Sequence, residues 1–182
     1  MISPDALIDH ARRLAGSGPG RPADVDLRRG VSAAYYAIFH DLTGRAASHL
    51  IGSADVSTQS AIRRTWSHGE LASLGTIVVE RVAVLARTPL APPTKELRAF
   101  GPLLDLAARD PNLVACLRDF MALQGQRHRA DYDHEATFDK ASLLAACTDA
   151  ATARTNLQHA TAAAQEGFFA LLTLRRPDFR AR

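Results

Sequence analysis

Apolar residues recur at steps of three and four along most of this chain, which is the spacing of one face of an α-helix. The clearest stretch contains Leu27, Val31, Ala34, Tyr35, Ile38 and Leu42. No segment alternates apolar and polar residues with the period of two expected of a half-buried strand. The sequence therefore predicts an all-α fold. We expect an antiparallel bundle of about five helices, whose many alanines allow the helix axes to approach closely.

Capping residues and breakers divide the chain into these helices. The expected caps are hydroxyl or carboxylate residues at Ser3, at Asp24 or Asp26, at Ser57 and at Asp110, which precedes a proline. The breaks fall at residues 16–20, 52–53 and 67–69, and a proline-rich stretch makes 88–111 the least regular region. The helix that begins at 110–111 is expected to run towards Tyr132, and a last long helix is expected from about Thr137 through Ala164.

The length of 182 residues, with 47% hydrophobic and 23% charged residues, is typical of one folding unit with its own core. We therefore expect a single helical domain over 1–182, with an irregular insert at about 88–111 and a basic tail at about 175–182. Cys116 and Cys147 are isolated in sequence, so neither a disulfide framework nor a thiolate zinc site is expected. No apolar run approaches the roughly 20 residues needed to cross a bilayer, and the first residues do not resemble a signal peptide. We expect no membrane partner and a cytoplasmic location.

The formal net charge is +3, and Lys95 and Lys140 are the only lysines, so almost all the positive charge is arginine. The planar guanidinium suits bidentate recognition of phosphate, which favours RNA or a nucleotide as partner. The alternative is that Ala- and Arg-rich composition simply follows from GC-rich codons.

The most informative polar cluster lies at 127–135. If this segment is helical, Arg127 and His134 share a face, because seven steps of about 100° return to within about 20° of the start. Asp131 lies between them on the same stripe and is placed to orient either one. The alternative is a helix-surface ion pair between Arg127 and Asp131. His128, Asp131 and Glu135 also have metal-ligand chemistry, but no second carboxylate-rich helix completes a bundle site, so no metal is expected.

Three segments resemble HEPN domains (higher eukaryotes and prokaryotes nucleotide-binding). Residues 34–40 resemble the A-Y-Y-A-x-F-H helix of that superfamily, and residues 67–68 resemble the S-H of one branch. Residues 127–133 resemble the R-x-x-A-D-Y-D of the same branch, in the expected order. The resemblance covers roughly residues 3–170.

This resemblance implies a small helical bundle, commonly dimeric, and often a metal-independent endoribonuclease or a toxin paired with a nucleotidyltransferase antitoxin. The implied active motif is an Arg, a polar residue and a His, which Arg127, His128 and His134 match. Asp131 would orient them, and Arg129 and Tyr132 would contact the substrate. The branch often lacks the terminal His, so Arg127 and Asp131 could instead form a structural pair.

If the motif is active, the chemistry needs no cofactor, because RNA carries its own nucleophile, the 2′-hydroxyl. His134 would act as general base or acid, Arg127 as phosphate clamp and His128 as a second proton carrier, giving a 2′,3′-cyclic phosphate. A homodimer would bring two motifs across a cleft.

Two other interpretations remain open, a catalytically silent HEPN module that binds a nucleotide or a protein and a purely structural dimer scaffold. Tyr35, Tyr36 and Phe39 are expected in the core or a dimer interface rather than in base stacking. His40 fits either a hydrogen-bonded core position or the site.

Overall fold

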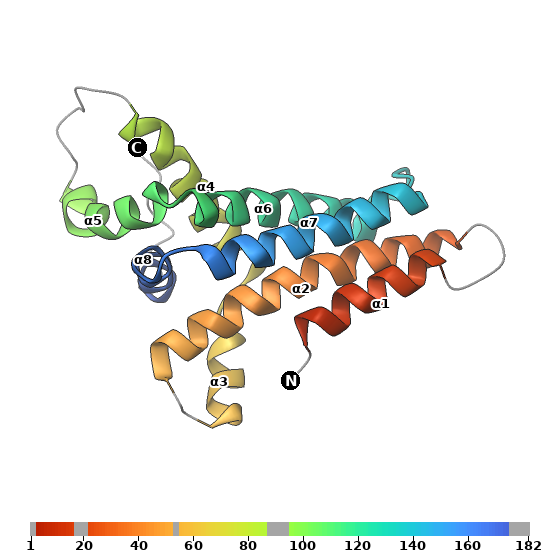
Figure 1. Cartoon of the computed structure of the whole chain (residues 1–182), viewed down its shortest axis with the longest axis horizontal. Coiled ribbons are helices and arrows are strands. Elements are labelled where there is room, and N and C mark those ends of the chain that lie inside the picture. Colours follow the sequence, from red (N-terminus) through yellow and green to blue (C-terminus); the bar gives the residue numbers. More distant parts are fainter. Residues whose placement is uncertain (1–2, 17–21, 53–54, 87–94, 175–182) are drawn as a thin grey trace. The chain divides into compact units, whose positions relative to one another are not determined.

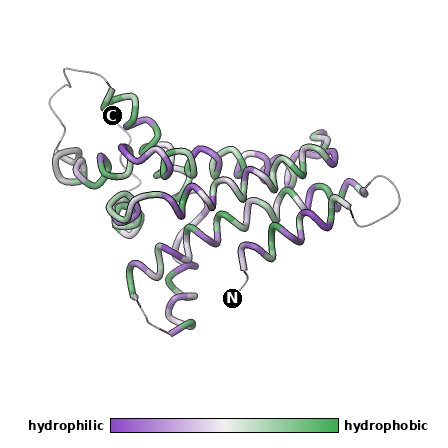
Figure 2. Tube along the Cα trace, in the orientation of Figure 1, coloured by the Kyte–Doolittle hydropathy of each residue, from purple (hydrophilic) through white to green (hydrophobic). Residues whose placement is uncertain are grey.

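The computed structural model describes residues 3–16, 22–52, 55–86 and 95–174, with only the backbone described for 95–99. These residues form eight helices and no strand, which confirms the all-α prediction but exceeds the expected number of about five helices (Figure 1). The helices are α1 (Pro4–Gly16), α2 (Asp24–Ile51), α3 (Val56–Arg63), α4 (His68–Leu85), α5 (Lys95–Arg109), α6 (Pro111–Tyr132), α7 (Lys140–His159) and α8 (Ala162–Thr173). Hydrophobic and hydrophilic residues are interspersed along them (Figure 2), and none of the helices in the described ranges is long and apolar enough to span a bilayer.

The chain groups into two compact units, each made from two separate segments. The first unit comprises residues 1–42 and 119–155, and the second comprises 43–118 and 156–182. Helices α2, α6 and α7 each contribute residues to both units. The expectation of one domain therefore stays a prediction, and the two units are described separately below.

The first unit is an antiparallel arrangement of α1, the first part of α2, the last part of α6 and the first part of α7 (Figure 1). Tyr35 of α2 is fully buried and stacks on Phe120 of α6, with ring centroids 5.6 Å apart. Arg154 of α7 forms ion pairs with Asp5 of α1 and with Asp41 of α2, the latter at 2.9 Å. Aromatic packing between α2 and α6, and the ion pairs of Arg154 with α1 and α2, thus connect the helices of this unit.

Two of the expected breaks are present, and one cap differs. Gly52 adopts a positive φ of 58°, which ends α2. Ser67 caps α4 in a reciprocal capping box with Glu70. The expected cap Ser57 is wrong, because the Asp55 carboxylate accepts hydrogen bonds from both the amide and the hydroxyl of Thr58 and so begins α3 two residues earlier.

In the second unit, the expectation of an irregular stretch over 88–111 is wrong for residues 95–109, which form α5 with Pro102 inside it. Leu104 and Ala107 are buried, and α5 packs closely on α8. A Cβ at Gly167 of α8 would lie 2.7 Å from the carbonyl oxygen of Leu103, so only glycine allows this approach. Burial against α8 outweighs the hydrogen bond that the proline removes. The rest of this stretch up to residue 94, and the basic tail at 175–182, lie outside the described residues.

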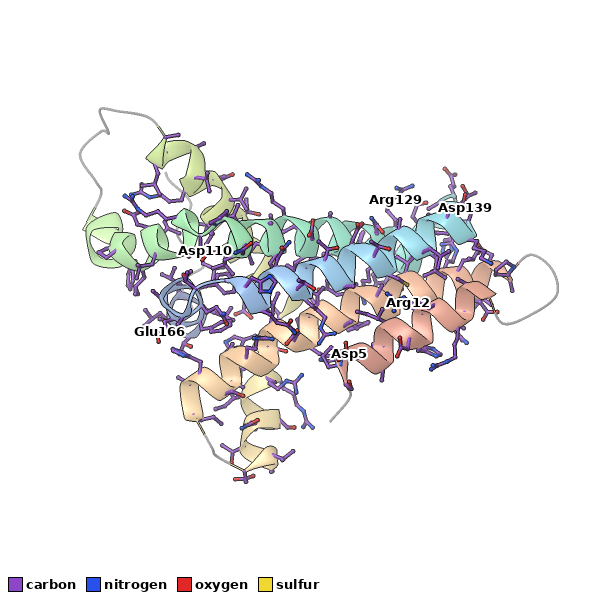
Figure 3. All side chains as sticks on the ribbon, viewed as in Figure 1. Asp5, Arg12, Asp110, Arg129, Asp139 and Glu166 are labelled. Carbon is purple, nitrogen blue, oxygen red and sulfur yellow. The ribbon has the colours of Figure 1, made fainter. Side chains whose placement is uncertain are left out.

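The last long helix is divided, contrary to expectation. It ends as α7 at His159 and resumes as α8 at Ala162, where Thr161 is the cap. The buried carboxylate of Asp110 accepts the amides of Leu113 and Thr161, each at 2.8 Å (Figure 3). Asp110 therefore caps α6, as its sequence context predicted, and also holds the junction before α8.

Candidate functional site

Arg127 is the central cation of the predicted site, and its contacts to Asp131, Tyr36 and Tyr132 all lie within the first unit. Its side chain is 19% exposed, and its Nε lies 2.6 Å from Oδ2 of Asp131. Nη2 donates a hydrogen bond of 3.3 Å to the Tyr36 hydroxyl. The guanidinium carbon lies 5.7 Å from the ring centre of Tyr36 and 5.5 Å from that of Tyr132. These contacts hold the guanidinium in one place between α2 and the end of α6.

Part of this guanidinium is left without a hydrogen-bond partner among the described residues. The Nε–H is close to Asp131 but is not aligned with it as a hydrogen bond. Nη1 donates no hydrogen bond within the described ranges, and it is not sealed from solvent. Burial lowers the pKa of Arg127, but Tyr36, the Asp131 carboxylate and Tyr132 together raise it by more, so the group stays charged.

Asp131 connects α6 with α2. The hydroxyl of Ser32 on α2 donates a hydrogen bond of 2.6 Å to Oδ1, while Oδ2 faces Arg127. Both carboxylate oxygens are therefore engaged, and the carboxylate is fixed from two sides. The structure thus brings Arg127 and Asp131 together as the spacing predicted, and it adds Ser32, which the sequence did not single out.

Three more of the predicted site residues lie on the surface of the last turns of α6. His128, Arg129 and Tyr132 are exposed, and the Tyr132 side chain is 60% exposed. The rings of His128 and Tyr132 lie 5.0 Å apart. Arg129 lies near the C-terminal end of α6 (Figure 3). An aromatic pair and two arginines are therefore adjacent at this end of the helix.

The expectation that Arg127 and His134 share a helix face is wrong. Helix α6 ends at Tyr132, and His134 lies in the exposed connection that follows it. Two residues seven apart lie on the same face only if the helix continues through both of them. His134 is therefore near the site in sequence, but it is not stacked over Arg127 on one helix.

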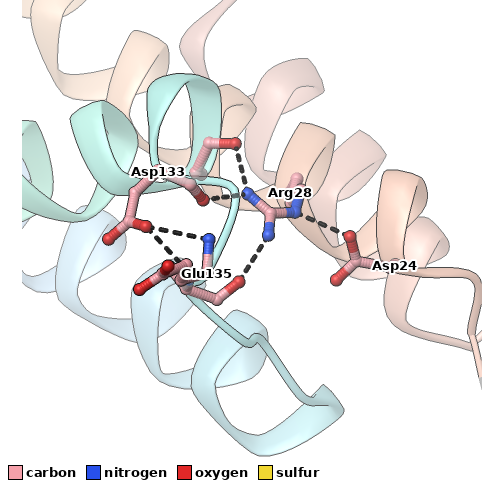
Figure 4. Close-up of polar contacts among 6 residues, drawn as sticks. Asp24, Arg28, Asp133 and Glu135 are labelled. Carbon is pink, nitrogen blue, oxygen red and sulfur yellow. Dashed lines mark hydrogen bonds and ion pairs between the residues drawn. The ribbon is translucent and has the colours of Figure 1, made fainter.

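Arg28 explains where α6 ends (Figure 4). Its Nη1 donates hydrogen bonds to the carbonyls of Ala130, at 3.1 Å, and Asp133, at 2.9 Å, and its Nη2 donates to the carbonyl of Ala136. Its Nε pairs with Asp24 at 2.7 Å. Nothing in the sequence marks Arg28 for this role, because only its spacing to Asp24 is visible locally and the carbonyls lie more than 100 residues away.

The aromatic residues of α2 occupy the interior. Tyr35 and Phe39 are buried, and burial raises the pKa of Tyr35 well above its ordinary value. Tyr36 is half-buried, and its ring stacks on His40 at 5.9 Å. Tyr35 and Phe39 are thus core residues, while Tyr36 contributes its hydroxyl to Arg127. The expected dimer interface involving these residues stays a prediction.

His128, Asp131 and Glu135 are not arranged as metal ligands. Over the described ranges, no group of three or more His, Cys, Asp or Glu side chains is placed to hold a metal ion. Comparison of the chain with family models, with curated proteins and with solved structures found no match.

Proposed function

We propose that this protein is a metal-independent endoribonuclease of HEPN type, acting on cytoplasmic RNA as a toxin or defence effector. The observation that carries the proposal is the state of Arg127. Asp131 and Tyr36 hold its guanidinium in place, while Nη1 remains without a hydrogen bond in the described structure. A preorganised cation with a spare donor suits a phosphate, because the enzyme need not reorganise as charge develops.

The proposed reaction uses the nucleophile that RNA itself supplies. A histidine removes the proton of the 2′-hydroxyl, whose oxygen attacks the adjacent phosphorus. Arg127 stabilises the charge on the non-bridging oxygens of the phosphorane. The bond from phosphorus to the 5′-oxygen breaks, and that oxygen takes a proton from a second group. The products are a 2′,3′-cyclic phosphate and a 5′-hydroxyl.

His128 and His134 are the proposed proton carriers. Both are exposed, so each can exchange protons with solvent between turnovers. Because His134 lies beyond the end of α6, one copy of the chain does not stack it over Arg127. A homodimer that faces two motifs would supply both groups. The resemblance also supports a nucleotidyltransferase antitoxin as a regulatory partner.

A second candidate function is a catalytically silent module that binds a nucleotide or a protein. Two observations favour it. Asp131 offsets the charge of Arg127, whose side chain is only 19% exposed, and the end of α6 takes His134 off the face of Arg127. In this alternative, Arg127 and Asp131 fasten α6 to α2, and binding depends on the exposed Arg129 and His128.

Cleavage of end-labelled RNA in excess EDTA distinguishes the two functions. The ribonuclease proposal predicts cleavage by the wild-type chain that His128→Ala and His134→Ala each lower at least roughly tenfold. His10→Ala, on the exposed surface of α1, is the matched control and should cleave at the wild-type rate. RNA binding without cleavage, with unchanged binding by His134→Ala, would support the silent module instead.

A further inference from the structure

We propose that Arg28 is a positioning residue, which sets the turn after α6 and thereby places His134. The catalytic meaning of that placement rests on the proposed ribonuclease function. Arg28 lies on α2, whereas the segment it holds lies more than 100 residues later, so the contact specifies tertiary structure and not local helix stability.

The carbonyls that Arg28 contacts belong to the end of α6 and the chain beyond it. The last carbonyls of a helix have no partner within the helix, and a cation at that end also matches the helix dipole. Arg28 bonds the carbonyls of Ala130 and Asp133 with one nitrogen and that of Ala136 with the other (Figure 4). Two of these acceptors, Asp133 and Ala136, flank His134 on either side.

The turn is also held from within. The Asp133 carboxylate accepts the amides of Glu135, at 3.0 Å, and Ala136, at 3.1 Å. The backbone around His134 is therefore fixed by Arg28 through its carbonyls and by Asp133 through its amides. The imidazole itself remains exposed. This combination, a fixed backbone with an accessible ring, is what a proton carrier needs.

Arg28 is itself held in place by contacts other than those with the turn. Its side chain is 19% exposed, Nε pairs with Asp24 at 2.7 Å, and the guanidinium carbon lies 5.5 Å from the centre of the Phe138 ring. All three nitrogens of the planar fork are used. A lysine carries the same charge but cannot reproduce the fork, so Arg28→Lys should not restore the turn.

The test compares Arg28→Gln and Arg28→Lys with Arg29→Gln, which removes the charge of the adjacent, exposed arginine. Hydrogen exchange of the amides at 133–139 and the NMR chemical shifts of the His134 imidazole at one pH report on the turn without requiring activity. We expect roughly tenfold faster exchange and changed His134 chemical shifts in both Arg28 variants. Arg29→Gln should match the wild type.

Cleavage kinetics provide the second readout. Arg28→Gln should lower kcat roughly tenfold and leave KM within about twofold, because the phosphate clamp at Arg127 is intact. Unchanged exchange and unchanged His134 chemical shifts in Arg28→Gln would overturn the inference, whatever the activity. A wild-type chain that cleaves no RNA, while Arg28→Gln still displaces His134, would overturn the proposed function and leave the positioning role of Arg28 standing.

Discussion

Nε of Arg127 lies 2.6 Å from Oδ2 of Asp131, one turn later on α6, while the Ser32 hydroxyl donates to the other oxygen of the same carboxylate. The carboxylate is thus shared between a cation on its own helix and a hydroxyl on α2. This sharing distinguishes the pair from an ordinary exposed helix pair, which contributes only a few tenths of a kcal/mol. Asp131 fixes where Arg127 lies and also opposes part of its charge.

Asp131→Asn should separate these two effects. Loss of the carboxylate charge should destabilise the fold by about 1 kcal/mol, since the pair is only partly shielded from solvent. It should also tighten RNA binding at low salt, because the charge of Arg127 is no longer offset and a repelling anion is gone. Urea unfolding and RNA titration at two salt concentrations measure the two effects.

Asp9→Asn is the control for Asp131→Asn. Asp9 forms an exposed ion pair with Arg12 on α1, at 3.5 Å. Asp9→Asn removes the same formal charge as Asp131→Asn does. If Asp9→Asn tightens RNA binding as much as Asp131→Asn does, the gain reflects net charge alone and Arg127 is not the phosphate contact.

Tyr132 should make the protein bind single-stranded RNA in preference to duplex RNA. The residue is 60% exposed and its ring lies beside Arg127, so an unpaired base can stack on it while the adjacent phosphate meets the guanidinium. A duplex keeps its bases stacked within the helix and cannot make this contact. Tyr132→Leu should weaken binding of a single-stranded oligonucleotide roughly tenfold and leave duplex binding unchanged, as measured by fluorescence anisotropy.

Tyr132→Phe keeps the ring and should bind single-stranded RNA within about twofold of the wild type. Equal losses in Tyr132→Phe and Tyr132→Leu would show that the hydroxyl matters and the aromatic face does not. Equal losses on single strands and duplexes would also contradict base stacking.

Asp110 should be important for the stability of the second unit. Its two oxygens serve different amides, Oδ1 that of Leu113 and Oδ2 that of Thr161. Asp110→Ala removes both acceptors and should lower the free energy of unfolding by about 2 kcal/mol. Asp110→Asn keeps one oxygen and should lower it by about half as much. Urea unfolding measures both, and identical losses in the two variants would contradict this division of roles.

The same contacts of Asp110 should make the free energy of unfolding depend on pH. Burial raises the pKa of Asp110, but the amides of Thr161, Leu113 and Asn112 and the Thr161 hydroxyl together lower it by more, so it lies below its ordinary value of 3.8. The stabilisation from Asp110 should therefore be complete above pH 3.8 and disappear as the pH falls through the lower folded-state pKa. The difference in unfolding free energy between wild type and Asp110→Asn should shrink on acidification below that pH. If this difference grows on acidification, the folded-state pKa of Asp110 is raised and not lowered, which would contradict the prediction.

The sequence was informative where local chemistry sets a boundary. Asp110 begins α6, as predicted, because its carboxylate accepts the amide of Leu113. The break predicted at 67–69 is also present, and there Ser67 and Glu70 form a capping box. The sequence was not informative where a distant residue decides. Thr161 caps α8 with its own side chain, but Asp110 also holds this junction by accepting the Thr161 amide from 51 residues away.

Two errors of the sequence-based prediction have the same origin. Pro102 suggested an irregular segment, but α5 forms because its apolar face packs on α8 at Gly167. The spacing of Arg127 and His134 suggested one helix face, but Arg28 bonds the carbonyls at the end of α6 and turns the chain first. Helical periodicity shows which residues would share a face; tertiary contacts decide how far the helix continues.

The central claim, that Arg127 clamps the reacting phosphate, is tested most directly by the cleavage rate and product ends of Arg127→Lys in excess EDTA. Lysine keeps the charge but not the planar fork, so we expect at least a hundredfold lower rate and only a modest loss of RNA affinity. Arg118→Lys, on the exposed surface of α6, is the control. Wild-type products should end in 2′,3′-cyclic phosphates. Cleavage by Arg127→Lys at the wild-type rate, or no cleavage by the wild type, would contradict the claim.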